Sequence, residues 1–340
     1  MTSDSSGNGR TILLVGGAGY VGTVLTRCLL DRGYGVRVLD SLIYGHGHAV
    51  RQFLNDPAFS FVHADMRDKE AMAAALDGMH GVVLLAGLVG DPICKKYPEL
   101  ARAINLDGCL QVFEMARDRG IERFVFASTC SNYGLRETDD LATEESDLNP
   151  VSLYAECKVA VEQHILASPP DGGMCAAVLR VATAYGFSQR MRFDLTISEF
   201  TRELALGRNL LVYDENTWRP YCHIVDLSRA VIMALEAPRG EVDREVFNVG
   251  NSDENFTKRM IVEVIEQHVG GGLAEYKVGG VDPRNYRVSF DKVRRVLGFE
   301  NSHDVRSEIP ALISSVRAGL FADVESDPNY YGNREIADAS

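Results

Sequence analysis

The sequence lacks the features by which several protein classes are recognised. Its seven cysteines are scattered and form no Cys-x-x-Cys pair, which argues against a disulfide framework or a zinc ribbon and for a reducing compartment. No run of about eighteen apolar residues occurs, and the polar, Gly/Ser-rich start of the chain has no apolar signal segment. We therefore expect a cytoplasmic protein with no membrane span.

Basic runs and metal-binding histidine spacings are also missing. The formal net charge is -13 over 340 residues and no Lys/Arg-rich stretch offsets it, so we do not expect a nucleic acid partner. Only His46 and His48 have a His-x-His spacing, and no carboxylate cluster lies beside them. We expect a flexible loop at this point and no metal site.

What the sequence does contain is an alternation of short apolar runs with helical segments, without an internal repeat. Such alternation predicts βαβ units and a parallel sheet. The expected strands are residues 11–15, 36–40, 60–63, 81–86, 124–128, 176–180 and 246–249.

After Gly186 the pattern changes to longer polar stretches with fewer apolar strands. We expect a main domain, a smaller α/β lobe that binds substrate, and two polar tails, of which the one from Asp323 is loosely ordered. Their bounds are 9–186 plus 223–250 for the main domain, 187–222 plus 251–320 for the lobe, and 1–8 and 323–340 for the tails.

A helix is expected from Pro98 to about Arg119. Its apolar stripe is wider than the ~100° that covers a sheet. The surplus apolar surface suits the contact of a homodimer, which we expect; burial within the same chain is the alternative.

The first expected strand leads into a glycine-rich turn with a helix behind it. Small residues at 16, 19 and 22 let the backbone approach a pyrophosphate, and the helix N-terminus offers free N–H groups. Asp40 ends the next strand, about 20 residues on, where a ribose-binding carboxylate belongs. The pattern predicts a Rossmann-type doubly wound sheet that binds a dinucleotide. Because the Asp40 carboxylate would repel a 2′-phosphate, we expect this dinucleotide to be NAD and not NADP. The expected contacts are Gly16, Gly19, Tyr20, Val21, Gly22 and Asp40.

Asp65, at the end of the third expected strand, has two interpretations. It could hydrogen-bond the adenine amino group, with Met66 beside it, or it could cap the helix that follows.

Tyr154 and Lys158 lie four residues apart, on one face of an expected helix. A lysine beside a phenol favours the phenolate and lowers its pKa, which lets a tyrosine act as a base near neutral pH. The pair follows a Ser/Thr-rich strand end at residues 128–131, so we predict a proton-transfer site.

Together these residues resemble the extended short-chain dehydrogenase/reductase family, specifically its NAD-dependent nucleotide-sugar epimerases and dehydratases (UDP-glucose 4-epimerase-like), over Thr11 to about Phe299. The resemblance implies that Thr129 hydrogen-bonds the sugar hydroxyl being oxidised, with Tyr154 as base and Lys158 beside it. It also implies further cofactor contacts, namely Leu85, Ala86, Gly87, Asn105, Ser128, Tyr154 and Lys158.

Departures from the family pattern narrow the chemistry. Dehydratases of this family carry an Asp-Glu pair after the catalytic threonine, where this chain has Cys130 and Ser131. A buried thiol is a poor acid or base, so 4,6-dehydration is disfavoured, and both residues are expected to line the substrate pocket. Thr183 replaces an asparagine that family members often place before the substrate diphosphate.

The expected partner is a nucleotide-diphosphate sugar, which needs cations in the second lobe. Arg192, Arg219 and Arg287 are the expected contacts, because an arginine fork suits phosphate oxygens. We expect a 4-epimerase that oxidises the sugar at C4 and returns the hydride to its other face. A pyranose–furanose mutase, a 4-ketoreductase or dehydrogenase, a dehydratase and a non-catalytic NAD sensor are the alternatives.

Overall fold

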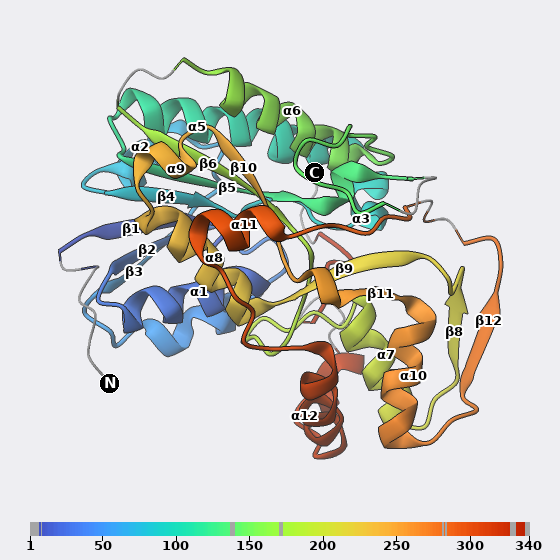
Figure 1. Cartoon of the computed structure of the whole chain (residues 1–340). Helices are drawn as coiled ribbons and strands as arrows, with labels where there is room; N and C mark the ends of the chain where they lie inside the picture. The colour runs from blue at the N-terminus through green and yellow to red at the C-terminus, as the bar shows by residue number, and fades with distance from the viewer. Residues whose placement is uncertain are drawn as a thin grey trace.

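A parallel sheet organises the larger part of the chain in the computed structural model (Figure 1), which describes residues 7, 9–136, 140–169, 173–280, 282, 284–326 and 331–336. Within these residues the sheet has seven strands in the order β10-β6-β5-β4-β1-β2-β3, all parallel. The predicted Rossmann-type doubly wound sheet is confirmed. The strands are β1 (Thr11–Val15), β2 (Gly35–Asp40), β3 (Phe59–His63), β4 (Gly81–Leu84), β5 (Arg123–Thr129), β6 (Cys175–Val181) and β10 (Glu245–Val249).

The strand order reverses between β1 and β4, which lie side by side at the centre of the sheet. Both strands are almost entirely apolar and buried, as expected for strands that are covered by helices on both faces. In open sheets of this kind, ligands bind in the crevice outside the carboxyl ends of the strands at the reversal. The topology therefore locates a binding site before any side chain is considered.

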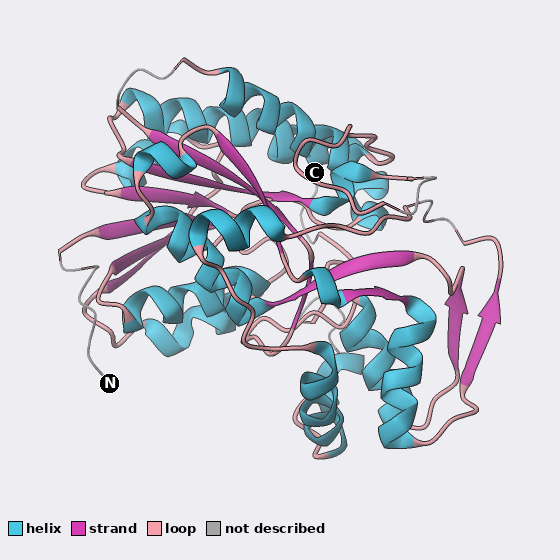
Figure 2. Cartoon of the chain, in the orientation of Figure 1, coloured by secondary structure: helices cyan, strands magenta, loops and turns pink. Residues whose placement is uncertain are grey.

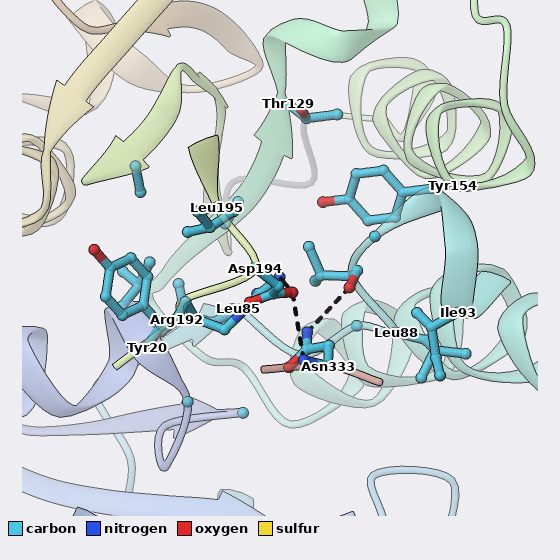
Figure 3. Close-up of a pocket in the computed structure, with 18 of the residues that line it drawn as sticks. Tyr20, Leu85, Leu88, Ile93, Thr129, Tyr154, Arg192, Asp194, Leu195 and Asn333 are labelled. Carbon is cyan, nitrogen blue, oxygen red and sulfur yellow. Dashed lines mark hydrogen bonds and ion pairs between the residues drawn. The ribbon is translucent and has the colours of Figure 1, made fainter. Parts of the chain in front are cut away.

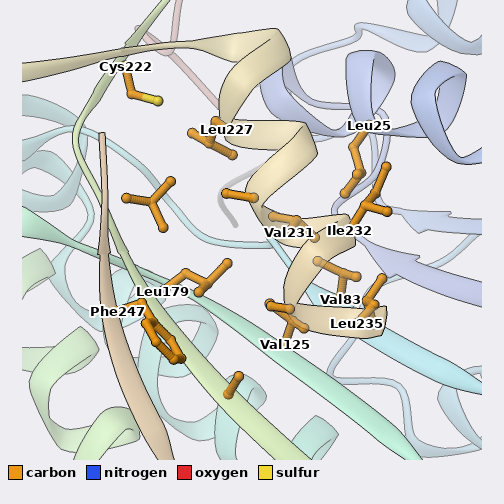
Figure 4. Packing of buried hydrophobic residues seen from close by; sticks show 14 of the residues in the cluster. Leu25, Val83, Val125, Leu179, Cys222, Leu227, Val231, Ile232, Leu235 and Phe247 are labelled. Carbon is orange, nitrogen blue, oxygen red and sulfur yellow. The ribbon is translucent and has the colours of Figure 1, made fainter. Parts of the chain in front are cut away.

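Helices cover both faces of the sheet (Figure 2). On one face lie α1 (Tyr20–Asp31) and α8 (Ile224–Glu236), which pack on each other; α1 also contacts β2, and the apolar side chains of α8 pack on β5 and β6 (Figure 4). The other face is covered by α2 (Lys69–Leu76), α5 (Cys109–Asp118) and α6 (Leu153–Ala167). Shorter elements of this part are η1 (Gly47–Phe53), α3 (Asp91–Lys96), η3 (Cys130–Tyr133) and α9 (Arg239–Val242).

The helix expected from Pro98 to about Arg119 is present but changes its winding. It begins as α4 (Pro98–Arg102), passes through a π-helical turn, η2 (Ala103–Gly108), and continues as α5. The apolar stripe of α5 is buried in its own chain at Cys109, Val112, Phe113 and Ala116. The homodimer stays a prediction.

A second hydrophobic cluster forms the smaller part of the molecule, to the right and below the main sheet in Figure 1. Helices α7 (Thr196–Ala205), α10 (Lys258–Val269) and α12 (Val305–Arg317) pack on one another there. Two small sheets accompany them, β11-β9-β7 and β12-β8. Their strands are β7 (Thr183–Tyr185), β8 (Leu210–Tyr213), β9 (Trp218–His223), β11 (Asn255–Thr257) and β12 (Ala274–Lys277).

Two expectations about the second part need correction. Tyr286, Phe290 and Val293, expected in the smaller lobe, are buried in the cluster that also contains β6 and β10, because α11 (Asp291–Leu297) packs on β10. The tail from 323 is not loosely ordered where it is described, because η5 (Ala322–Glu325) and residues 331–336 are packed and include buried Tyr331 and Ile336. Residues 1–6, 8, 327–330 and 337–340 of the expected tails lie outside the described residues.

Candidate active site

A cavity of about 900 Å³ opens at the carboxyl ends of the central strands, between the sheet and the smaller part. Its lining contains most of the residues that the sequence singled out, and Figure 3 shows several of them pointing into one space. The predicted residues in the lining are Gly16, Gly19, Tyr20, Val21, Gly22, Asp40, Asp65, Met66, Leu85, Ala86, Gly87, Ser128, Thr129, Ser131, Tyr154, Lys158, Thr183, Arg192 and Arg219.

Two positions of the glycine turn have no room for a side chain. Gly16 has a φ of +83°, and a Cβ there would lie 2.6 Å from the Cα of Ala86. A Cβ on Gly22 would lie 2.5 Å from the Cα of Gly17, so α1 packs against the turn without a side chain between them. Gly19 is the N-cap of α1 and carries no capping side chain, so the first N–H groups of the helix face the cavity rim. The turn therefore fits the pyrophosphate of a dinucleotide.

Asp40 lies at the end of β2 with its carboxylate at the cavity. Its Oδ2 accepts from the backbone N of Ala18 at 3.0 Å, and its Oδ1 accepts from that of Leu42 at 2.8 Å. These bonds fix the carboxylate beside the turn, where a ribose hydroxyl can donate to it. His46 lies 3.5 Å from Asp40 and is buried in the same wall, so the loop expected to be flexible at this point is packed and leads into η1.

The N-cap of the helix that follows Asp65 decides between its two interpretations. Asp68 is the N-cap of α2 and accepts from the N–H groups of Glu70 and Ala71, so Asp65 does not cap that helix. Asp65 lines the cavity and pairs with Arg67 at 2.7 Å. Burial opposes its ionised form, but the bonds from Arg67 hold the pKa of Asp65 below its usual range.

Asn105 acts from outside the cavity. It is fully buried in the π-helical turn, where its Oδ1 accepts from the Leu88 N–H at 2.7 Å and its Nδ2 donates to the Leu88 carbonyl at 3.0 Å. Both bonds hold the backbone that follows Leu85–Gly87. Asn105 thus positions the cavity wall and does not itself line it.

Thr129, Tyr154 and Lys158 converge on the cavity from β5 and α6. The Tyr154 hydroxyl points into the open space and Thr129 ends the neighbouring strand (Figure 3). Lys158 is buried; its Nζ donates to the Ala127 carbonyl at 2.8 Å and lies 5.8 Å from the centre of the Tyr154 ring. The three groups can bind a hydroxyl and transfer its proton.

The sequence predicted a lowered pKa for the Tyr154 phenol, but the surroundings of the side chain have the opposite effect. Burial raises the pKa of Tyr154, because an apolar environment disfavours the phenolate. Burial also lowers the pKa of Lys158.

A buried ion pair beneath Thr129, Tyr154 and Lys158 was not predicted. Glu162 of α6 is fully buried and receives the guanidinium of Arg180 from β6, with Nη2 at 2.8 Å from Oε2. Ser128 donates to the same carboxylate, and Asn132 donates to it at 2.7 Å. The network joins α6 to two strands and fixes the strand end that carries Thr129. In sequence these residues look like an ordinary helix position and a strand end.

Two of the predicted substrate residues lie outside the cavity lining. Cys130 is buried in the main core and its thiol donates to the Arg180 carbonyl, because the chain enters η3 at this residue and turns the side chain inward. Burial raises the pKa of Cys130 well above its usual value. Arg287 stacks on Trp218 at 5.2 Å, since alternation along this extended segment puts the neighbouring Tyr286, and not Arg287, toward the cavity.

Arg284, three residues earlier, takes the place expected for Arg287. Its Nη1 donates to the Ser131 hydroxyl at 3.2 Å, and its Nη2 lies 3.2 Å from Asp91. Asp282 bridges Arg284 and Arg219, with contacts of 2.7 and 2.8 Å. Arg284, Asp282 and Asp91 all line the cavity and were missed. Arg192 is also in the lining and is paired with Asp194 at 2.5 Å.

One histidine cluster lies away from the cavity. His223, Asp226 and His303 place their ligand atoms within 4.8 Å of one another. The Asp226 carboxylate already accepts from the N–H and hydroxyl of Ser302 and from Arg229, and Nδ1 of His223 accepts from Val225. These bonds join α8 to the segment before α12 and are structural.

Comparison with known proteins agrees with this geometry. Residues 12–250 match the model of the NAD dependent epimerase/dehydratase family. The chain belongs to this family. NAD is accordingly the cofactor of the cavity, which the glycine turn and Asp40 fit.

Several relatives and solved structures match most of the chain. It is 28% identical over 317 residues to the UDP-glucose 4-epimerase of Corynebacterium glutamicum, covering 87% of this chain and 92% of that protein. The UDP-glucose 4-epimerase of Thermotoga maritima, solved with UDP-glucose, superposes with a TM-score of 0.80 at 25% identity over 91% of this chain and 99% of that chain. The dTDP-glucose 4,6-dehydratase of Streptomyces venezuelae, solved with NAD, gives 0.81 at 26% identity over 94% and 99%.

Among the described residues, no helix combines the length and the apolar character that a membrane crossing requires.

Proposed function

We propose that the protein is an NAD-dependent 4-epimerase of a nucleotide-diphosphate sugar. The observation that carries the proposal is the convergence of Thr129, Tyr154 and Lys158 on a cavity that also contains the dinucleotide turn. The relatives at 28% identity are UDP-glucose 4-epimerases, which supports a nucleotide sugar as the substrate.

In this proposal each chemical group has one task. Thr129 hydrogen-bonds the hydroxyl at sugar C4, Tyr154 accepts its proton, and Lys158 contributes positive charge beside the phenol. When bound, NAD supplies the hydride acceptor and a positive nicotinamide charge that favours the Tyr154 phenolate. Tyr154 then returns the proton to the oxygen of the epimerised sugar.

Elimination of water is disfavoured by the residues after Thr129. A dehydratase needs an acid and a base beside the reacting sugar, whereas Cys130 is turned into the core and Ser131 is a hydroxyl bonded to Arg284 and Tyr286.

For the substrate, we propose contacts from Ser131, Thr183, Arg219 and Arg284, with Arg192 supporting the wall through its pair with Asp194. Arg219 and Arg284 share one carboxylate, Asp282, and Asp91 pairs with Arg284 as well, so the formal charges of these four side chains balance. The two guanidinium groups would therefore bind a diphosphate through their N–H donors and not through an excess of positive charge.

The test is product identification. The purified protein is incubated with UDP-, dTDP-, GDP- and CDP-sugars, and the products are identified by NMR. We expect a C4 epimer with no net change in NADH. A ring-contracted sugar would make the protein a mutase, net NADH consumption or formation a reductase or dehydrogenase, and a 4-keto-6-deoxy product a dehydratase.

A further inference from the structure

Residues 331–336 cross the active-site cavity and contact both sides of it. Asn333 and Arg334 are part of the cavity lining, and Figure 3 shows Asn333 in the same space as Tyr154 and Asp194. Among the described residues that follow Tyr286 in the chain, only Asn333 and Arg334 line this cavity. The segment is therefore an addition to a site that earlier residues build.

On the side of the smaller part, the segment is held by the loop before α7. The Phe193 N–H donates to the Tyr331 carbonyl at 2.7 Å. Arg190 donates to the Gly332 carbonyl at 2.8 Å and to Oδ1 of Asn333 at 3.2 Å. The Asn333 N–H donates to Asp194 at 3.3 Å. The Tyr331 ring is buried in the second hydrophobic cluster.

On the side of the main sheet, the same few residues contact the segment that follows β4. Nδ2 of Asn333 donates to the Val89 carbonyl at 3.0 Å. Glu335 pairs with Lys96 at 2.9 Å. Ile336 is buried in a small cluster, whose other buried members are Tyr44, Leu88, Ile93, Cys94 and Ala101.

The two loops joined in this way cover different parts of the cofactor site. The loop before α7 lies on the glycine turn, because the Ser188 hydroxyl donates to the Tyr20 carbonyl at 2.8 Å and Arg190 stacks on Tyr44. The segment after β4 continues from Leu85–Gly87, which lie by Lys158. A connection between these loops spans the groove from the pyrophosphate turn to the catalytic residues.

We propose that residues 331–336 form a clasp that retains NAD in its cleft, with Asn333 as its positioning residue. Asn333 holds both loops at once, since its side chain bonds to Arg190 and Val89 and its backbone bonds to Asp194. NAD cannot leave along the groove until these bonds open. If the proposed epimerase function holds, the clasp also keeps the reduced cofactor in place until the hydride returns.

Four variants test the clasp. The chain cut after residue 330 lacks the whole segment, Asn333→Ala removes the side-chain bonds, and Ile336→Ser weakens the apolar anchor. The matched control is cut after residue 336 and keeps the segment. Bound nucleotide is measured after gel filtration by heating the protein and quantifying the released NAD, and the release rate by exchange against labelled NAD.

We expect the wild type and the control to release NAD at the same rate. Asn333→Ala should release it about tenfold faster, the change that corresponds to one or two lost hydrogen bonds. The chain cut after 330 should lose its NAD during gel filtration. Circular dichroism and thermal melting show whether that protein is folded; if it is not, Asn333→Ala and Ile336→Ser decide.

Unchanged NAD release in folded Asn333→Ala and Ile336→Ser proteins would overturn the clasp. Faster turnover by a truncated protein that keeps its NAD would also overturn the clasp, because the segment would then obstruct the substrate. The NAD-release measurements need no sugar substrate, whereas the turnover comparison does. A protein that retains NAD through the clasp but epimerises no nucleotide sugar would refute the proposed function alone.

Discussion

At the scale of single residues, Tyr154 lies in surroundings that oppose the negative charge that the proposed reaction would place on its phenol. Burial raises the pKa of its phenol, and the nearby cation, Lys158, is itself buried. An enzyme that uses this phenol as a base needs the positive charges of Lys158 and NAD to offset that burial.

We expect Tyr154→Phe to lower kcat by about 10²–10⁴-fold, the usual contribution of general acid–base catalysis. NAD content should be unchanged, since the phenol hydroxyl binds no described part of the dinucleotide turn. The control is Tyr276→Phe, whose ring packs with Arg259 away from the cavity. Full turnover by Tyr154→Phe would show that another group moves the proton.

Arg284 and Arg287 give a second residue-scale test. Arg284→Gln should raise KM for the nucleotide sugar about tenfold to hundredfold, because it removes charge-assisted bonds at the substrate end. Arg287→Gln is the matched control and should leave KM nearly unchanged, since Arg287 lies on Trp218 outside the lining. Steady-state kinetics on both variants checks this, and equal effects would contradict the assignment.

The residues that the sequence singled out reach the cavity lining where a backbone element fixes them. The glycine turn, Asp40 and the Tyr154–Lys158 pair lie on or next to regular strands and helices, whose spacing determines direction. Cys130 and Arg287 lie outside the cavity lining because no such element fixes them: Cys130 begins η3 directly after β5, and Arg287 lies in the extended segment between β12 and α11. Local turns then decide where a side chain points, and Asp91 and Arg284 meet only through the tertiary fold.

At the scale of elements, the π-helical turn η2 matters because it presents Asn105 to the segment after β4. Asn105→Ala would leave the buried N–H of Leu88 without its partner, while the Leu88 carbonyl would keep the bond from the Cys94 thiol. We expect the free energy of unfolding to fall by about 1–3 kcal/mol, the usual cost of one buried polar group left without a partner. Urea unfolding measures this, with exposed Gln52→Ala as the control, and NAD affinity should fall as well.

Strands and helices of the main domain were predictable because burial on both faces imposes long apolar runs. The π-helical turn η2 was not predictable from the sequence, since such a turn adds one residue to a helix without changing the apolar character of that helix. The division near residue 286 was also missed, because the apolar residues of an extended segment do not specify which of two cores they enter.

At the scale of the whole molecule, Glu254 joins separate elements of the smaller part. It is buried, accepts from the Tyr185 hydroxyl at 2.8 Å and from the Val305 N–H at 3.1 Å, and so links β7 to the start of α12. Burial raises the pKa of Glu254 from 4.5 to about 7.

This shift gives the stability a pH dependence of known sign. The folded state holds the Glu254 proton more tightly than the unfolded state, so its contribution is complete below pH 4.5 and is lost as pH rises through about 7. The loss is on the order of 3 kcal/mol. Urea unfolding at pH 5 and 8 should show a smaller fall in Glu254→Gln than in the wild type. Exposed Glu263→Gln should behave like the wild type, and an equal fall in all three proteins would contradict this.

The position of residues 331–336 in the chain sets an order of events during synthesis. Every other residue of the cavity lining precedes them, and Arg192 and Asp194, which complete the cofactor wall, are made about 140 residues earlier. At the usual rate of translation this interval is roughly 10–30 seconds. During it a nascent chain carries the residues of the dinucleotide turn and no segment across the groove. Cofactor entry is therefore expected before residues 331–336 are in place, and a mature protein once stripped of NAD should reload slowly.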